Sequence, residues 1–211
     1  MYRTLFVTTL FSLLLLAACS DPTGNSASAN TGDAKKVVEE KGKELTFSQE
    51  GSKISFVGAK VTMKHPGGFS KFAGKVITSD DGKTVKQVEV DIDLNSLWAA
   101  NDGDGADKPN EKLTGHLKSA DFFNVEKHPK GKFVSTEIKK DGDNFIVTGN
   151  LTFHDVTKSV TFPAKVTADA GKVTAKAEFK INRHDWKLDY NGAIDNAIHD
   201  DVAILFDIQA K

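Results

Sequence analysis

Several features common in other classes of protein are scarce or missing in this chain. Cys19 is the only cysteine among 211 residues, so no intramolecular disulfide can form. Charge is nearly balanced, with 28 Lys and Arg against 29 Asp and Glu, and no basic block occurs. A nucleic-acid partner is therefore not expected. The apolar run from Leu5 to Leu16 is shorter than the ~20 residues that a membrane-spanning helix needs.

Motifs for catalysis and for metal binding are also missing. The sequence contains no GxSxG, no P-loop and no glycine-rich dinucleotide turn, so an enzyme is not predicted. The acidic run Asp102–Asp107 departs from the EF-hand pattern, with Ala106 at a ligand position and Asp107 at the place of the glycine. The six histidines are scattered without zinc-site spacing. No metal and no cofactor are predicted.

The N-terminus has the pattern of an export signal. Arg3 precedes the apolar run, which ends in Leu-Ala-Ala-Cys and resembles a bacterial lipobox. This pattern predicts a lipoprotein signal peptide over residues 1–18 and acylation of Cys19, although an ordinary signal peptide that contains a cysteine is the alternative. Ser20, rather than Asp, follows the cysteine, as in lipoproteins sent to the outer membrane of double-membraned bacteria. The expected location is the cell envelope, lipid-anchored in the outer membrane and facing the periplasm.

The next segment, residues 19–43, is polar and poor in apolar side chains. Such a composition cannot bury enough surface to order itself, so a flexible tether is predicted. A chain of this length would hold a domain roughly 25–30 Å from the bilayer.

Residues 44–211 contain enough chain for one domain, and alternation of apolar and polar residues dominates it. Apolar side chains recur at every second position in four long runs, at Val88–Leu94, Phe145–Phe153, Val173–Ile181 and Val202–Ile208. This period is typical of half-buried antiparallel strands. Gly-containing turns at 80–83, 141–144 and 169–172 separate strands, and one helix is expected near 111–120. The pattern predicts an all-β domain, either a closed barrel or a sandwich.

The interior side chains leave a second question open. Large residues such as Phe153 and Phe179 alternate with very small ones such as Gly58 and Gly149. Small residues could let a filled barrel bend at its corners, or they could leave a long apolar cavity. Fourteen Phe against two Tyr and two Trp favour an apolar interior in either case.

Four segments resemble the YceI-like family in order and spacing. They are SKISF at 52–56, HPGGFSKFAG at 65–74, HLKSADFFNVEKHP at 116–129 and LTFHDVTKSV at 151–160, where the family has a hairpin with a Thr-Lys turn. Ile181-Asn182-Arg183 and Trp186 match the segment before the final strand. The loop at 98–112 is longer than is usual in the family. The resemblance implies an antiparallel eight-stranded, lipocalin-like barrel that holds an amphiphile with a long isoprenoid tail, of the polyprenyl phosphate or quinone type.

The candidate ligand contacts follow from that expectation. An isoprenoid tail needs an apolar slot, for which the candidates are Phe56, Phe72, Phe122, Phe123, Phe145, Leu151, Phe153, Phe179 and Phe206. A polar head needs donors at the mouth, for which the candidates are His65, Lys118, His154 and Arg183. Each of these could instead be a solvated surface residue or, for His154, a hydrogen-bonded histidine in a turn. The helix at 111–120 could cover the mouth.

Two functions remain open at this point. The first is an envelope carrier or reservoir of an isoprenoid lipid. The second is a non-enzymatic interaction or scaffold module with a filled barrel. The expected partners are the lipid and the membrane that holds the anchor, and a second copy of the chain in a homodimer is a further candidate.

Overall fold

The computed structural model describes residues 26–61, 63–169, 171–190 and 198–211. The predicted signal peptide and Cys19 lie outside these residues. Within the described residues, no helix is both long and apolar enough to cross a bilayer.

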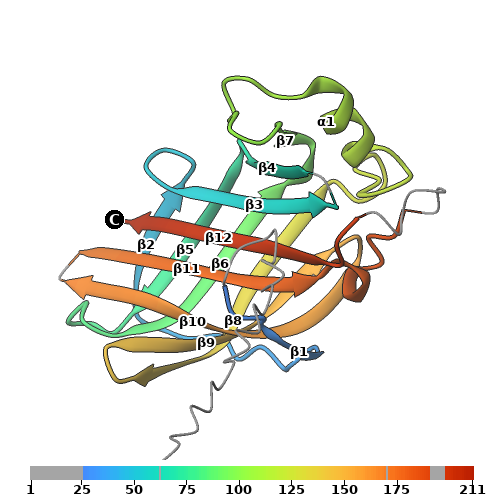
Figure 1. Ribbon diagram of the computed structural model, residues 1–211. Helices are drawn as coiled ribbons and strands as arrows, with labels where there is room; N and C mark the ends of the chain where they lie inside the picture. The colour runs from blue at the N-terminus through green and yellow to red at the C-terminus, as the bar shows by residue number, and fades with distance from the viewer. Residues whose placement is uncertain (1–25, 62, 170, 191–197) are drawn as a thin grey trace, which may run out of the picture.

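Strands dominate the described part of the chain (Figure 1). The strands are β1 (Asn30–Asp33), β2 (Lys43–Ser48), β3 (Lys53–Lys60), β4 (Met63–Phe69), β5 (Phe72–Thr78), β6 (Val85–Asp93), β7 (Leu97–Ala99), β8 (Lys130–Asp141), β9 (Asn144–Phe153), β10 (Val156–Asp169), β11 (Lys172–Asn182) and β12 (Asp201–Ala210). One α-helix, α1 (Glu111–Lys118), confirms the expected helix, and two 3₁₀ turns, Leu94–Ser96 and Arg183–Trp186, were not predicted.

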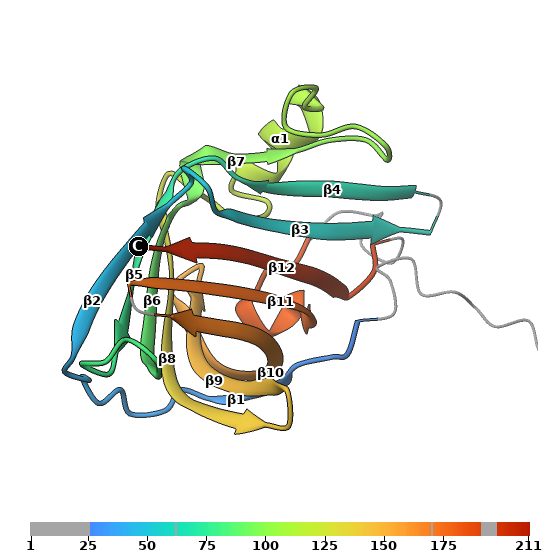
Figure 2. The same ribbon diagram turned by 90° about the vertical axis from the view of Figure 1, so that its left-hand side faces the viewer.

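The strands form a strongly curled antiparallel sheet, whose curvature is visible in Figure 2. Each of the pairs β2–β3, β4–β5 and β6–β7 is one run of chain that bends, so that with β8 to β12 the described residues make eight runs. The circle closes because β12 pairs with β3 and, at its end, Lys211 and Thr46 exchange backbone hydrogen bonds of 3.0 and 3.1 Å. The predicted all-β, antiparallel, barrel-like fold with one helix is confirmed, whereas the strand count differs, since twelve separate strands make up the eight runs.

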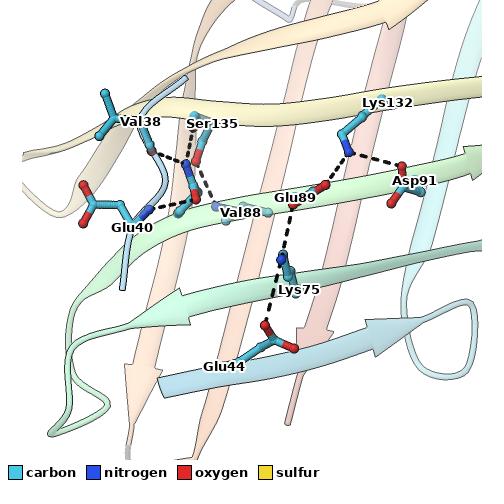
Figure 3. A network of polar contacts seen from close by, with 10 residues as sticks. Val38, Glu40, Glu44, Lys75, Val88, Glu89, Asp91, Lys132 and Ser135 are labelled. Carbon is cyan, nitrogen blue, oxygen red and sulfur yellow. Dashed lines mark hydrogen bonds and ion pairs between the residues drawn. The ribbon is translucent and has the colours of Figure 1, made fainter. Parts of the chain in front are cut away.

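The alternating pattern places polar side chains outside the barrel. On the outer face of β2, β5, β6 and β8, Lys75 lies 3.9 Å from Glu44 and 3.6 Å from Glu89, and Lys132 contacts Glu89 and lies 3.6 Å from Asp91 (Figure 3). Lys132 lowers the pKa of Glu89 below its ordinary value, chiefly through their hydrogen bond. Charges of alternating sign on neighbouring strands support the register that the apolar inner face requires.

The hairpin between β9 and β10 turns at a different place from the one expected. The family resemblance puts the turn at Thr157-Lys158, but the structure puts it at His154-Asp155, with φ angles of 49° and 57°. Two successive residues at positive φ form the tight turn whose twist matches the flanking strands. Thr157 and Lys158 instead lie within β10.

Part of the segment expected to be a flexible tether lies along the outer wall of the barrel. β1 pairs with residues 158–161 of β10, where β10 has separated from β11, and Ala27 and Ala29 bond to the backbone of Lys180 on β11. This N-terminal strap, residues 26–41, therefore fills a gap in the barrel wall. Its polar composition suits this position, because backbone groups rather than apolar side chains hold it.

Two buried amide side chains hold the rest of the strap. Asn150 accepts a hydrogen bond from the backbone N–H of Lys35 at 2.9 Å and donates to its carbonyl at 2.7 Å. Gln87 binds the strap a few residues further along, where it donates to the carbonyl of Val38 at 2.9 Å and accepts from the N–H of Glu40 at 3.3 Å. An amide offers the same donor and acceptor as a peptide group, so both residues act as substitutes for a neighbouring strand.

Candidate ligand cavity

The interior of the barrel is packed at one end. Phe162 and Phe179 stack with their ring centroids 4.0 Å apart, and Phe133 and Phe206 close around them at 5.9 and 5.7 Å. Phe179 is completely buried. This end of the barrel is an aromatic core, with a small void of about 60 Å³ against Phe133, Phe162 and Phe206.

The other end is hollow. A cavity of about 450 Å³ opens there, within the range of roughly 300–1,000 Å³ typical of small-molecule sites. Aromatic and aliphatic side chains supply most of its lining, with basic groups among them. The lining residues are Phe56, Gly58, Ala59, Lys60, Val61, His65, Phe69, Leu113, His116, Leu117, Phe122, Phe123, Phe153, Ile181, Arg183, Leu188, Ile198, His199, Val202 and Ile204.

Two inward glycines show why one end is filled and the other is not. A Cβ placed on Gly149 would lie 2.4 Å from the ring of Phe133, so this glycine makes room for the packed core. A Cβ placed on Gly58, which lines the cavity, would meet no atom within 4 Å. Both explanations of the small residues thus apply, because Gly149 makes room for a ring and Gly58 leaves open space in the cavity.

Helix α1 and the turn after it cover one side of the cavity. Asn110 caps the helix by accepting a hydrogen bond from the N–H of Leu113 at 3.0 Å, and Thr114 fastens it to Ala99 of β7 at 3.0 and 3.2 Å. The chain then turns back, with the N–H of Phe123 donating to the carbonyl of Leu117 at 3.0 Å. Leu117, Phe122 and Phe123 consequently face the cavity.

Arg183 brings a buried positive charge to the cavity wall. Its side chain is 3% exposed, and it donates to the carbonyl of Leu188 at 2.8 Å and lies 3.7 Å from the carboxylate of Asp200. Burial of a charge is costly unless it is paired and hydrogen-bonded, and Arg183 satisfies both conditions. It also ties the turn after β11 to the start of β12, which leaves its charge at a fixed position.

His65 also lines the cavity, and a hydrogen bond fixes which of its ring nitrogens carries the proton. Its Nδ1 lies 3.1 Å from the carbonyl oxygen of Ala100, which can only accept, so Nδ1 carries the proton. Nε2 of the neutral ring is then an acceptor, and on protonation it becomes a second donor. His116 lies on α1 with its ring edge-on to Tyr190 at 4.9 Å.

The structure brings together only part of the residues that were selected from the sequence. Phe56, Phe122, Phe123 and Phe153 line the cavity, as do His65 and Arg183 among the head-group candidates. The others are not in its lining: Phe72 and Leu151 are buried in the core, Phe179 and Phe206 belong to the packed end, and Phe145 is half-buried at the start of β9. Lys118, at the end of α1, is not in the lining.

His154 occupies the β9–β10 turn, apart from the cavity. Its ring stands edge-on to His128 with centroids 4.3 Å apart, and its Nδ1 is buried without a hydrogen-bond partner. Burial, followed by the effect of His128, lowers the pKa of His154 below 6.5. These contacts give it a structural place in the turn rather than a place among the lining groups.

Several lining residues were not selected from the sequence, namely Lys60, Phe69, His116 and His199. Phe69 and His116 lie inside two of the recognised segments, so a signal for them was present. Lys60 and His199 come from strand ends that meet only in the folded barrel, where the N–H of His199 donates to the carbonyl of Ala59 at 2.9 Å.

The stability of the protein is expected to depend measurably on pH through His184, which follows Arg183 in the chain. Asp189, and then Asp200 at 2.9 Å from Nε2, raise the pKa of His184 above 6.5. The stabilisation is complete below the unfolded pKa and is lost as the pH rises through the raised folded pKa. Since His184 is 38% exposed, it should amount to less than about 1 kcal/mol.

Urea unfolding of the wild type and of His184→Gln between about pH 6 and pH 8 tests this. The stability advantage of the wild type should shrink as the pH rises. Parallel curves for the two proteins over this interval would contradict the role of His184.

No group of three or more His, Cys, Asp or Glu side chains that could hold a metal ion occurs in the ranges that the structure describes. The polar groups around the cavity are instead single cations and imidazoles on an apolar wall. Such a cavity can hold the apolar part of a ligand and place a polar or anionic end of that ligand near the basic groups.

An antiparallel barrel of eight runs that is packed at one end and hollow at the other is lipocalin-like in architecture. Solved structures share it. BcnA of Burkholderia cenocepacia aligns with a TM-score of 0.65 and 24% identity over 78% of this chain and 99% of its own. A polyisoprenoid-binding domain from Saccharophagus degradans, implicated in plant cell wall breakdown, aligns with a TM-score of 0.60 and 17% identity over 81% and 99%.

Within that architecture, the family profile of the YceI-like domain matches residues 45–210, and the chain therefore belongs to the YceI-like family. UPF0312 protein ECA1782 of Pectobacterium atrosepticum is 41% identical over 47% of each chain. Protein YceI of Salmonella arizonae is 36% identical over 58% of this chain and 62% of its own. The matched part thus spans about half to three fifths of these curated relatives.

Proposed function

We propose that the barrel binds an isoprenoid amphiphile, of the polyprenyl phosphate or quinone type, and serves as its carrier or reservoir. The apolar cavity at one end of the barrel carries this proposal. The polyisoprenoid-binding domain from Saccharophagus degradans, which shares the fold, supports the same class of ligand.

The tail and the head of such a ligand find different partners in the cavity. Phe56, Phe123 and Phe153 offer an apolar wall to the tail, where each buried CH₂ contributes about 0.8 kcal/mol. The buried guanidinium of Arg183 attracts an anionic head, and His65 can exchange a hydrogen bond with a phosphate or a quinone oxygen. Affinity would come mainly from the tail and orientation from the head.

We further propose that the protein works from a lipid anchor on Cys19 in the cell envelope, facing the periplasm from the outer membrane. The docked strap changes the geometry of this attachment. With residues from Ser26 onward held on the barrel, only seven peptide links separate the strap from Cys19, which span at most about 25 Å. The barrel would then stay close to the bilayer from which a lipid ligand comes.

Lipid extraction tests the proposed function directly. The chain from Ser20 onward, exported to the periplasm of a bacterial host so that it meets envelope lipids, should carry an isoprenoid lipid in near-stoichiometric amount. Mass spectrometry of an organic extract of the purified protein measures it. A well-folded preparation without lipid would support the alternative, an interaction module that acts through its surface.

A further inference from the structure

The hairpin that joins β3 to β4 exposes apolar side chains. Val61 is 75% exposed and Met63 is 42% exposed. Among the described residues, the other large apolar side chains exposed to this degree are Val37 and Val38, which lie on the strap. Lys60, Val61, Met63 and Lys64 are called the rim hairpin below.

The rim hairpin is continuous with the cavity. Lys60 and Val61 belong to the cavity lining, although both are exposed to solvent. The strands that lead to them lie side by side (Figure 2), and Gly58 and His65, paired across these strands, line the cavity a little deeper. The exposed apolar side chains therefore stand at the opening through which a ligand would pass.

The side chains that flank these two apolar residues are positively charged. Lys60 and Lys64 flank the two apolar residues and are exposed. Asp200, the residue before β12, is engaged by His184 at 2.9 Å and by Arg183 at 3.7 Å. Apolar side chains between lysines suit an anionic bilayer surface, where the lysines meet the headgroups and the apolar groups enter the acyl boundary.

We propose that the rim hairpin docks on an anionic phospholipid bilayer and so turns the cavity opening toward the membrane. The idea that a ligand passes between membrane and cavity rests on the proposed function. The docking of the rim hairpin does not require a bound lipid. An amphiphile could then move between bilayer and cavity without exposing its tail to water.

Vesicle binding by the chain from Ser20 onward, which keeps every residue that the structure describes, tests the proposal. The wild type should cosediment with vesicles of phosphatidylcholine and phosphatidylglycerol, and much less with phosphatidylcholine alone. The variant Met63→Ser with Lys64→Gln leaves the cavity lining untouched. It should bind the anionic vesicles about tenfold more weakly, since one lysine contributes roughly fivefold and the methionine adds apolar burial.

A matched control variant removes one exposed apolar side chain and one exposed lysine from the strap instead of the rim hairpin. Val38→Ser with Lys41→Gln changes an exposed apolar residue and an exposed lysine on the strap, and it should bind the vesicles as the wild type does. Absence of wild-type binding, or equal losses in the two variants, would overturn the docking proposal. Lipid in the organic extract is measured on the same preparations, so a failure of docking is distinguished from a failure of the proposed function.

Discussion

Replacing Phe179 by alanine is expected to lower the free energy of unfolding by about 3–5 kcal/mol, the usual cost of removing a fully buried phenylalanine. Phe179 has no exposed surface, stacks on Phe162 at 4.0 Å and contacts Phe206 edge-on at 5.7 Å. The packed end leaves its neighbours little freedom to fill the space. Equilibrium urea unfolding, with the midpoint and slope fitted together, measures the loss.

Phe145→Ala provides the comparison for this experiment. Phe145 is half-buried at the start of β9, so its removal should cost clearly less, about 1 kcal/mol. Equal losses in the two variants would mean that the end of the barrel around Phe179 is not densely packed in solution.

Replacing Gly58 by phenylalanine is expected to weaken lipid binding on the order of a hundredfold while the barrel still folds, so that the purified protein carries clearly less lipid. A Cβ on Gly58 meets no atom within 4 Å, and the position lines the cavity, so the new ring has room only where a ligand would lie. Displacing three or four CH₂ groups of a tail, at about 0.8 kcal/mol each, gives this factor. Mass spectrometry of organic extracts, normalised to protein, measures it.

Gly32→Phe is the matched control for that variant. A Cβ on Gly32 would also meet no atom within 4 Å, but this glycine lies exposed in β1 on the outer wall. The Gly32→Phe protein should retain wild-type lipid. A folded Gly58→Phe protein that carries as much lipid as Gly32→Phe would show that the ligand is not in the cavity.

Local patterns in the sequence were sufficient to predict most of the fold. In β8, Phe133 and Ser135 are buried while Lys132 beside them is not, as the period of two predicts. Gly82 and Gly142 adopt positive φ angles of 72° and 57° in turns that their neighbours already marked. These features depend on residues close in the chain, which is why they could be read without the structure.

Two features could not be predicted from local patterns: the position of the strap, and which end of the barrel interior is packed and which is hollow. Residues 30–33 lack the apolar alternation of a strand, and they form β1 because β10 leaves part of its edge open to them. Asn150 and Gln87 hold the following part of the strap, at Lys35, Val38 and Glu40. Likewise Phe153 and Phe179 have the same residue type and the same strand context. One lines the cavity and the other lies in the packed core.

The sequence by itself determined the all-β class, the helix at the barrel end and the family, because alternation, turn residues and short motifs act over a few residues. Only the tertiary structure decided which glycine opens space and which one accommodates a ring, and which basic groups meet at the cavity. Those outcomes depend on the distance between strands that are far apart in the chain, as between Gly149 and Phe133 or between Ala59 and His199. Closure of the barrel sets these distances, and closure is a property of all eight runs together.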